Sequence, residues 1–238
     1  MSFALIMLGD MYFYGHGVNL NRKKACELYK KALSSRDISS VNPDQIAEVY
    51  ALLGRAYTEK FADCGNITKT EAVGYLKKAF DLGNYESIRC LALLEKELDK
   101  DEADWLYQTA SKYPNNASCL FALGICYEFG KGTVQDFKLA FECYQKSAEK
   151  GDPWGMHYLA YAYFAGQGTE KNMQEGFKWE LCAAEFVPQA QFNVGISYLN
   201  GHGVNKNTEE SVKWLKRASE NFYSAADEIL EEINKSHK

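Results

Sequence analysis

Apolar residues recur at helical spacing in the stretch 117–154, and glycines interrupt them at fixed points. Leu120, Leu123 and Tyr127 fall on one face, because residues three, four and seven apart lie on the same side of a helix. Gly130 and Gly132 then break that helix, since glycine readily adopts the positive φ of a tight turn. The pattern predicts a helix that ends in a Gly-x-Gly turn.

A second apolar stripe follows the turn, at Ala140, Tyr144 and Ala148. Gly151 is placed to end this helix, and Pro153 prevents its continuation because proline lacks the backbone N–H. The stretch therefore predicts two antiparallel helices joined by a glycine turn.

This helix-pair unit recurs along the chain. The residues equivalent to Gly124 are Ala160 and then Gly195, and Tyr127 is repeated as Tyr163 and Tyr198. The turn glycines recur in the pairs Gly15 and Gly17, Gly166 and Gly168, and Gly201 and Gly203. A period in the mid-thirties with two helices per unit is typical of an α-solenoid.

The whole chain is therefore expected to be all-α and to form one repeat array over residues 1–238. The array is expected to contain about thirteen helices, as six antiparallel pairs and a capping helix at 222–238 with a polar outer face. The expected repeats are 1–33, 46–82, 83–114, 115–150, 151–186 and 187–221.

The second and third repeats depart from the pattern. The segment 60–70 replaces the Gly-x-Gly turn of the second repeat, and the loop of the third repeat has no glycine. Helices are expected at 85–98 and 102–112 in that third repeat. A polar insertion at 34–45 follows the first repeat, and Asp44 is the expected N-terminal cap of the next helix.

The composition changes this picture little. The net charge is −5, so the chain lacks the basic surface expected of a nucleic-acid-binding protein. An apolar stretch of about 18 residues, long enough to span a membrane, is not found in the sequence. The cysteines are 7, an odd number, and they do not take paired positions in successive repeats, which favours reduced thiols and a cytoplasmic protein.

Motifs that suggest chemistry are better explained by the repeat. Ser147 and Lys150 match an S-x-x-K pattern, but the other motifs of serine enzymes with that pattern do not accompany them. His16 and His202 occupy the middle of glycine turns, where Lys131 and other polar residues also occur. Zinc-type spacing of cysteines or histidines is missing. Catalytic, cofactor-binding and metal-binding residues are therefore not expected, and the chain is not expected to be an enzyme.

The repeated pattern L-G-x-x-Y-x-x-G-x-G, followed by Ala and an aromatic residue, resembles the Sel-1-like repeat family, a variant of the tetratricopeptide repeat. The resemblance implies a right-handed superhelix that acts as an adaptor in protein complexes. Four segments carry it: LGDMYFYGHGVNLNRKKACELYKKA, LGICYEFGKGTVQDFKLAFECYQKSAEKG, LAYAYFAGQGTEKNMQEGFKWELCAA and VGISYLNGHGVNKNTEESVKWLKRAS.

The same resemblance implies where a partner binds. In tetratricopeptide arrays, fixed positions of the first helices line the concave groove, and aromatic residues are common binding hot spots. The alternative is that tight coiling of the array buries several of these side chains as core. The implied protein-binding positions are Phe121, Ile125, Glu128, Trp154, His157, Tyr161, Phe164, Phe192, Ile196 and Leu199.

The expected function is thus a non-enzymatic scaffold or adaptor that binds a protein or peptide partner in its concave groove. Two alternatives are a regulatory or targeting subunit of an enzyme complex and a bacterial secreted effector that engages a host protein. Nucleic acid, a membrane span, a cofactor and a small-molecule substrate are not expected. A cytoplasmic location is expected, with delivery into a host cell, or the ER lumen for a fragment of a longer chain, as alternatives.

Overall fold

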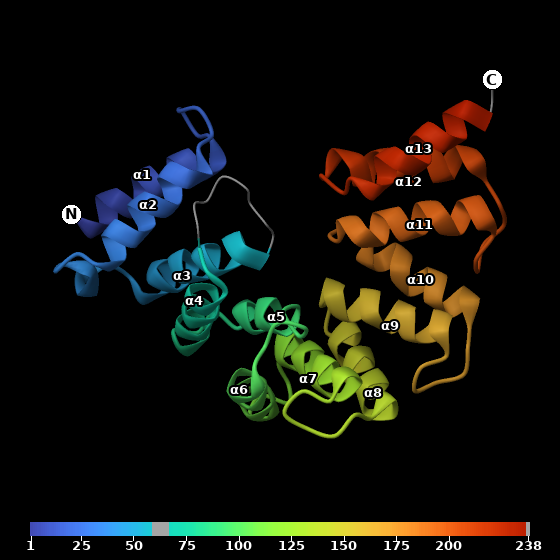
Figure 1. Ribbon diagram of the computed structural model, residues 1–238, viewed down its shortest axis with the longest axis horizontal. Coiled ribbons are helices and arrows are strands. Elements are labelled where there is room, and N and C mark those ends of the chain that lie inside the picture. The colour runs from blue at the N-terminus through green and yellow to red at the C-terminus, as the bar shows by residue number, and fades with distance from the viewer. Residues whose placement is uncertain (59–66, 237–238) are drawn as a thin grey trace. The chain divides into compact units, whose positions relative to one another are not determined.

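The computed structural model describes residues 1–58 and 67–236 of the 238 in the chain. In this part the regular structure is helical throughout, with thirteen α-helices and one short 3₁₀ helix (Figure 1). The predicted all-α repeat architecture is confirmed. The chain folds as two compact units, Met1–Glu102 and Ala103–Lys238.

The first unit is built on two helix pairs. α1 packs on α2, α3 packs on α4, and α5 packs against α3 and α4. Ile6, Tyr29, Leu53 and Ala72 belong to a continuous buried core in this unit. The helices are α1 (Ser2–Tyr14), α2 (Arg22–Leu33), α3 (Pro43–Thr58), α4 (Lys69–Asp81) and α5 (Glu86–Ala92), with the 3₁₀ helix η1 (Ile38–Ser40) between α2 and α3.

The second unit stacks regular helix pairs. Its pairs are α7 with α8, α9 with α10 and α11 with α12, and α13 covers α12 (Figure 1). The second helix of each pair packs on the first helix of the next, so α8 contacts α9 and α10 contacts α11. The helices are α6 (Lys100–Ser111), α7 (Ala117–Phe129), α8 (Phe137–Glu149), α9 (Pro153–Ala165), α10 (Met173–Ala183), α11 (Pro188–Asn200), α12 (Thr208–Glu220) and α13 (Ala225–Ser236).

The two glycines of each turn have different structural roles. Gly130 ends α7 in the left-handed conformation with φ 63°, and its N–H donates to the Cys126 carbonyl. Gly132 also has a positive φ, and a Cβ there would lie 2.6 Å from the Ala103 carbonyl oxygen. At Gly168 and Gly203, a Cβ would overlap the carbonyl oxygens of Phe137 and Met173. The second glycine therefore lets the turn pack against the second helix of the preceding repeat.

Small residues also set the distance between paired helices. A Cβ at Gly124 of α7 would lie 2.5 Å from Cδ1 of the buried Tyr144 ring on α8. The same arrangement occurs in the first repeat, where a Cβ at Gly9 would lie 2.5 Å from Cε1 of Tyr29. Glycine is needed here because the ring occupies the space of a side chain.

The third repeat differs from the expectation. α5 ends at Ala92 instead of continuing to residue 98, and the bonds that follow are turn-like, from Glu95 N to Ala92 O and from Glu97 N to Leu94 O. α6 begins at Lys100 instead of Glu102. The Asp99 carboxylate accepts from the Glu102 N–H while the Glu102 carboxylate accepts from the Asp99 N–H, and this reciprocal capping starts the helix earlier.

The start of α3 also differs. The helix begins at Pro43, so Asp44 lies inside its first turn and does not cap it. The Asn42 side chain instead accepts from the Asp44 N–H at 2.9 Å. Most of the segment 60–70, expected to replace the glycine turn, lies outside the described residues.

An apolar face of α1 is exposed. Phe3, Met7, Met11 and Tyr14 follow one another along the helix and are 38–53 % exposed. We call these four residues the α1 face. The described helices include none that is long and apolar enough to cross a membrane.

Candidate functional site

Three of the expected groove residues are buried. Phe121 and Ile125 are fully buried on α7, and His157 on α9 is 6 % exposed. The expectation that they line an open groove is wrong. The Phe121 ring lies 6.0 Å from the Tyr144 ring and 5.2 Å from the Tyr158 ring, because α8 and α9 both pack closely on α7.

His157 belongs to a buried polar network. Its Nδ1 lies 3.0 Å from both carboxylate oxygens of Glu180 on α10. Asn193 on α11 donates its amide N–H to Glu180 Oε1 at 2.6 Å. These bonds satisfy the Glu180 carboxylate, which is 1 % exposed, and they join three helices. His157 therefore has a structural explanation.

The other expected residues, except Glu128 and Tyr161, are half-buried between repeats. Trp154 and Phe164 pack against the cluster that contains Phe177 and Val194. The remaining three pack against the cluster of Leu215, Ala226 and Ile233 near the C-terminus, namely Phe192, Ile196 and Leu199. Only part of each side chain is available to a partner.

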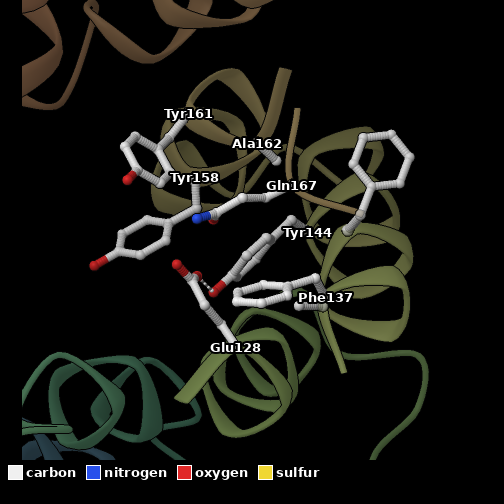
Figure 2. A pocket seen from close by; sticks show the side chains of 9 residues that line it. Glu128, Phe137, Tyr144, Tyr158, Tyr161, Ala162 and Gln167 are labelled. Atoms are coloured by element: carbon white, nitrogen blue, oxygen red, sulfur yellow. Dashed lines mark hydrogen bonds between the residues drawn. The ribbon is translucent and has the colours of Figure 1, made fainter. Parts of the chain in front are cut away.

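Tyr161 is the exposed member of the set, with half of its side-chain surface accessible. It lines a hollow of about 190 Å³ between the α7–α8 pair and α9, shown in Figure 2. The hollow is mostly aromatic, with one carboxylate and one amide. Its lining residues are Glu128, Phe137, Ala140, Phe141, Tyr144, Tyr158, Tyr161, Ala162 and Gln167.

Glu128 and Tyr144 form the polar centre of this hollow. The Tyr144 hydroxyl donates to Glu128 Oε2 at 2.5 Å, as the dashed line in Figure 2 shows. Burial, together with the nearby Glu128 charge and hydrogen bond, holds the pKa of Tyr144 well above its usual value. Tyr144 therefore stays protonated and continues to donate to the carboxylate.

The repeat positions these groups. Glu128 lies in the last turn of α7, where the Gln135 side chain donates to the Glu128 carbonyl at 2.7 Å. Tyr158 and Tyr161 are three residues apart on α9, so they lie on neighbouring positions of one helix face. Gln167 occupies the middle of the glycine turn after α9.

Sequence reasoning named only part of the hollow. Glu128 and Tyr161 were among the expected groove positions, and Tyr144 was expected in the packed stripe of α8. Tyr158 and Gln167 were missed. The position of Gln167 in a turn slot that also holds Lys and His indicated only exposure, and Tyr158 is seen as a lining residue only after α9 is placed on α8.

Within 1–58 and 67–236, groups of three or more His, Cys, Asp or Glu side chains that could hold a metal ion do not occur. The hollow itself offers a single carboxylate beside aromatic rings. Such a surface is suited to recognition of another molecule.

Comparison with known proteins places these features in a family. The profile of the Sel1 repeat matches more than half of the chain, at residues 2–37, 68–84, 117–152, 155–185 and 188–221. The third expected repeat is almost entirely outside the matched segments, in agreement with its irregular helices.

Curated relatives share part of the chain. A protein of Rattus norvegicus named DAP3-binding cell death enhancer 1 is 38 % identical over 87 residues, which are 35 % of this chain and 17 % of that protein. Its namesake in Mus musculus is 36 % identical over 88 residues. The chain thus spans less than a fifth of the length of the curated relatives it matches.

Solved structures share the fold. A Sel1 repeat protein from Oxalobacter formigenes is 24 % identical with a TM-score of 0.63, over 92 % of this chain and 85 % of that one. A protective antigen of uropathogenic Escherichia coli strains, described as displaying an SLR fold, is 24 % identical with a TM-score of 0.53. This match covers 97 % of our chain and 48 % of the antigen.

Proposed function

Because the chain belongs to the Sel1 repeat family, we propose that it is a non-enzymatic scaffold or adaptor that binds a partner protein. Sel1 repeat proteins generally serve as scaffolds for protein interactions. The proposed site is the first-helix face around α7 and α9, with the hollow at Tyr161 as its centre. A protein or peptide is the proposed partner.

The observation that carries this proposal is the exposure of Tyr161. The equivalent residue of the preceding repeat, Ile125, is fully buried, whereas Tyr161 is 50 % exposed beside a hollow lined by further rings. Exposed aromatic residues next to a depression are the usual anchors of protein interfaces. Trp154, Phe164, Phe192, Ile196 and Leu199 supply half-buried surface on the neighbouring helices α9 and α11.

The rodent relatives give limited support. Their printed name says that they bind DAP3, and the matched residues are only a small share of those proteins. We take from them a protein-binding role in general, and the identity of the partner here is left to experiment.

The test uses peptides selected from a random display library on the intact chain. Tyr161→Ala is expected to weaken binding of the selected peptides at least about tenfold, because the ring is a central anchor. The control is Phe186→Ala, which removes an aromatic side chain that is 75 % exposed outside the hollow. Equal affinity of both variants and the wild type would reject the proposed site.

A further inference from the structure

The hollow at Tyr161 combines a carboxylate with aromatic rings. Glu128 supplies the charge, and it is only 8 % exposed. Tyr158 and Tyr144 stand close together with ring centroids 5.3 Å apart, and Tyr161 lies on the same face of α9 as Tyr158. Figure 2 shows the Glu128 carboxylate directed toward the space beside Tyr158 and Gln167.

We propose that this hollow receives the cationic head of a lysine or arginine side chain of the partner. The inference rests on the proposed function and names the chemistry that the site selects. An ammonium or guanidinium group is attracted by the Glu128 carboxylate and by the faces of the tyrosine rings, which carry negative charge density. Gln167 adds a side-chain amide oxygen that accepts a hydrogen bond.

The low exposure of Glu128 strengthens this attraction. A carboxylate withdrawn from water interacts with a nearby cation through a lower effective dielectric and is screened less by salt than a surface charge. The Tyr144 hydroxyl holds the carboxylate in one orientation through its 2.5 Å bond. A carboxylate accepts several hydrogen bonds at once, so this bond and a partner cation are compatible.

The other regular repeats lack this combination. The residues equivalent to Glu128 are Phe13, Phe164 and Leu199, which are apolar. The next repeat has its carboxylate at Glu180, where His157 and Asn193 already bond it inside the fold. A carboxylate facing an aromatic hollow is therefore a specific feature of the junction between α7, α8 and α9.

The test is an NMR titration of the isotope-labelled full chain with three probes. They are Nα-acetyl-lysine methylamide, Nα-acetyl-arginine methylamide and the neutral Nα-acetyl-norleucine methylamide. We expect a cationic probe to shift the amide signals of Tyr161 and Gln167 saturably, with a Kd at least about tenfold lower than that of the norleucine probe, a difference of about 1.4 kcal/mol.

Glu128→Gln removes the charge while its amide oxygen still accepts from Tyr144. This variant is expected to lose the preference for the cation and to keep the melting temperature within a few degrees. The control is Glu220→Gln, which changes the net charge equally at an exposed position on α12 and should bind as the wild type does. The proposal is overturned by unchanged cation binding in Glu128→Gln, by equal binding of norleucine, or by absence of saturable binding.

These results are separable from the proposed function. Peptide capture that depends on Tyr161, together with equal binding of the norleucine and lysine probes, overturns the cation site and leaves the scaffold role standing. Peptide capture that is independent of Tyr161 overturns the proposed binding face itself.

Discussion

At the residue scale, Gly124 carries the contact between α7 and α8. Gly124→Val places a branched side chain where the Tyr144 ring lies, so we expect a loss of stability of about 1–3 kcal/mol. The matched control is Gly74→Ala in α4, where an added Cβ meets nothing within 4 Å. That variant should be stabilised by about 0.5–1 kcal/mol, because alanine favours the helix. Thermal unfolding of both variants measures the difference, and loss of stability in Gly74→Ala would contradict it.

The buried thiols make stability fall at high pH. Burial raises the pKa of Cys119 and of Cys126 from 9.0 to about 12. Both thiols stay protonated in the folded state while the unfolded chain ionises above about pH 9. Their contribution to stability is thus complete below pH 9 and is lost as the pH rises toward 12. Cys119→Ser with Cys126→Ser keeps the hydroxyls un-ionised, so the alkaline loss measured by urea unfolding should become smaller.

The burial of individual groove positions could not be predicted from the sequence. Ile125 and Tyr161 occupy the same position in successive repeats, yet the first is fully buried and the second half exposed. Register gives the helix face of a side chain, whereas its exposure depends on the side chains that the neighbouring repeat brings over it. The His157–Glu180 pairing is likewise a contact between residues 23 positions apart.

At the element scale, the second glycine of each turn joins successive repeats. Gly168→Ala would place a Cβ on the Phe137 carbonyl oxygen, in addition to the strain of a φ of 71–72° shared by both turn glycines. Gly130→Ala has a similar positive φ, but its nearest neighbour would be 3.5 Å away. We expect both variants to be destabilised, and Gly168→Ala by about 1–3 kcal/mol more. Equal melting temperatures would show that the turn does not carry the contact between repeats.

The regular elements were predictable because local signals agree there. Helix periodicity, the glycine turns and the Asn or Asp caps act within a few residues of one another, as at Asn116, Asp136 and Asn172. The third repeat lacks its glycine turn, and its first helix ends early at Ala92. The sequence periodicity continues beyond Ala92, so it did not reveal that short turn-like bonds take over from the helix.

At the scale of the whole molecule, the regular repeats should be the more stable part. Repeat proteins derive stability from each repeat and from its contacts with neighbours. The repeats of Ala103–Lys238 have Gly-x-Gly turns at 130–132, 166–168 and 201–203, whereas the second and third expected repeats lack them. Native-state hydrogen exchange is expected to show slower exchange in α7–α12 than in α3–α5. Slower exchange in α3–α5 would contradict this order.

The most direct measurement of the central claim is a map of where a partner binds. A selected peptide is titrated into the isotope-labelled full chain, and the shifted amide signals are assigned. The account predicts that the largest shifts cluster at Glu128, Tyr158, Tyr161 and Gln167, around the hollow. Shifts confined to the α1 face or to the second helices α8, α10 and α12, with the hollow unaffected, would contradict it.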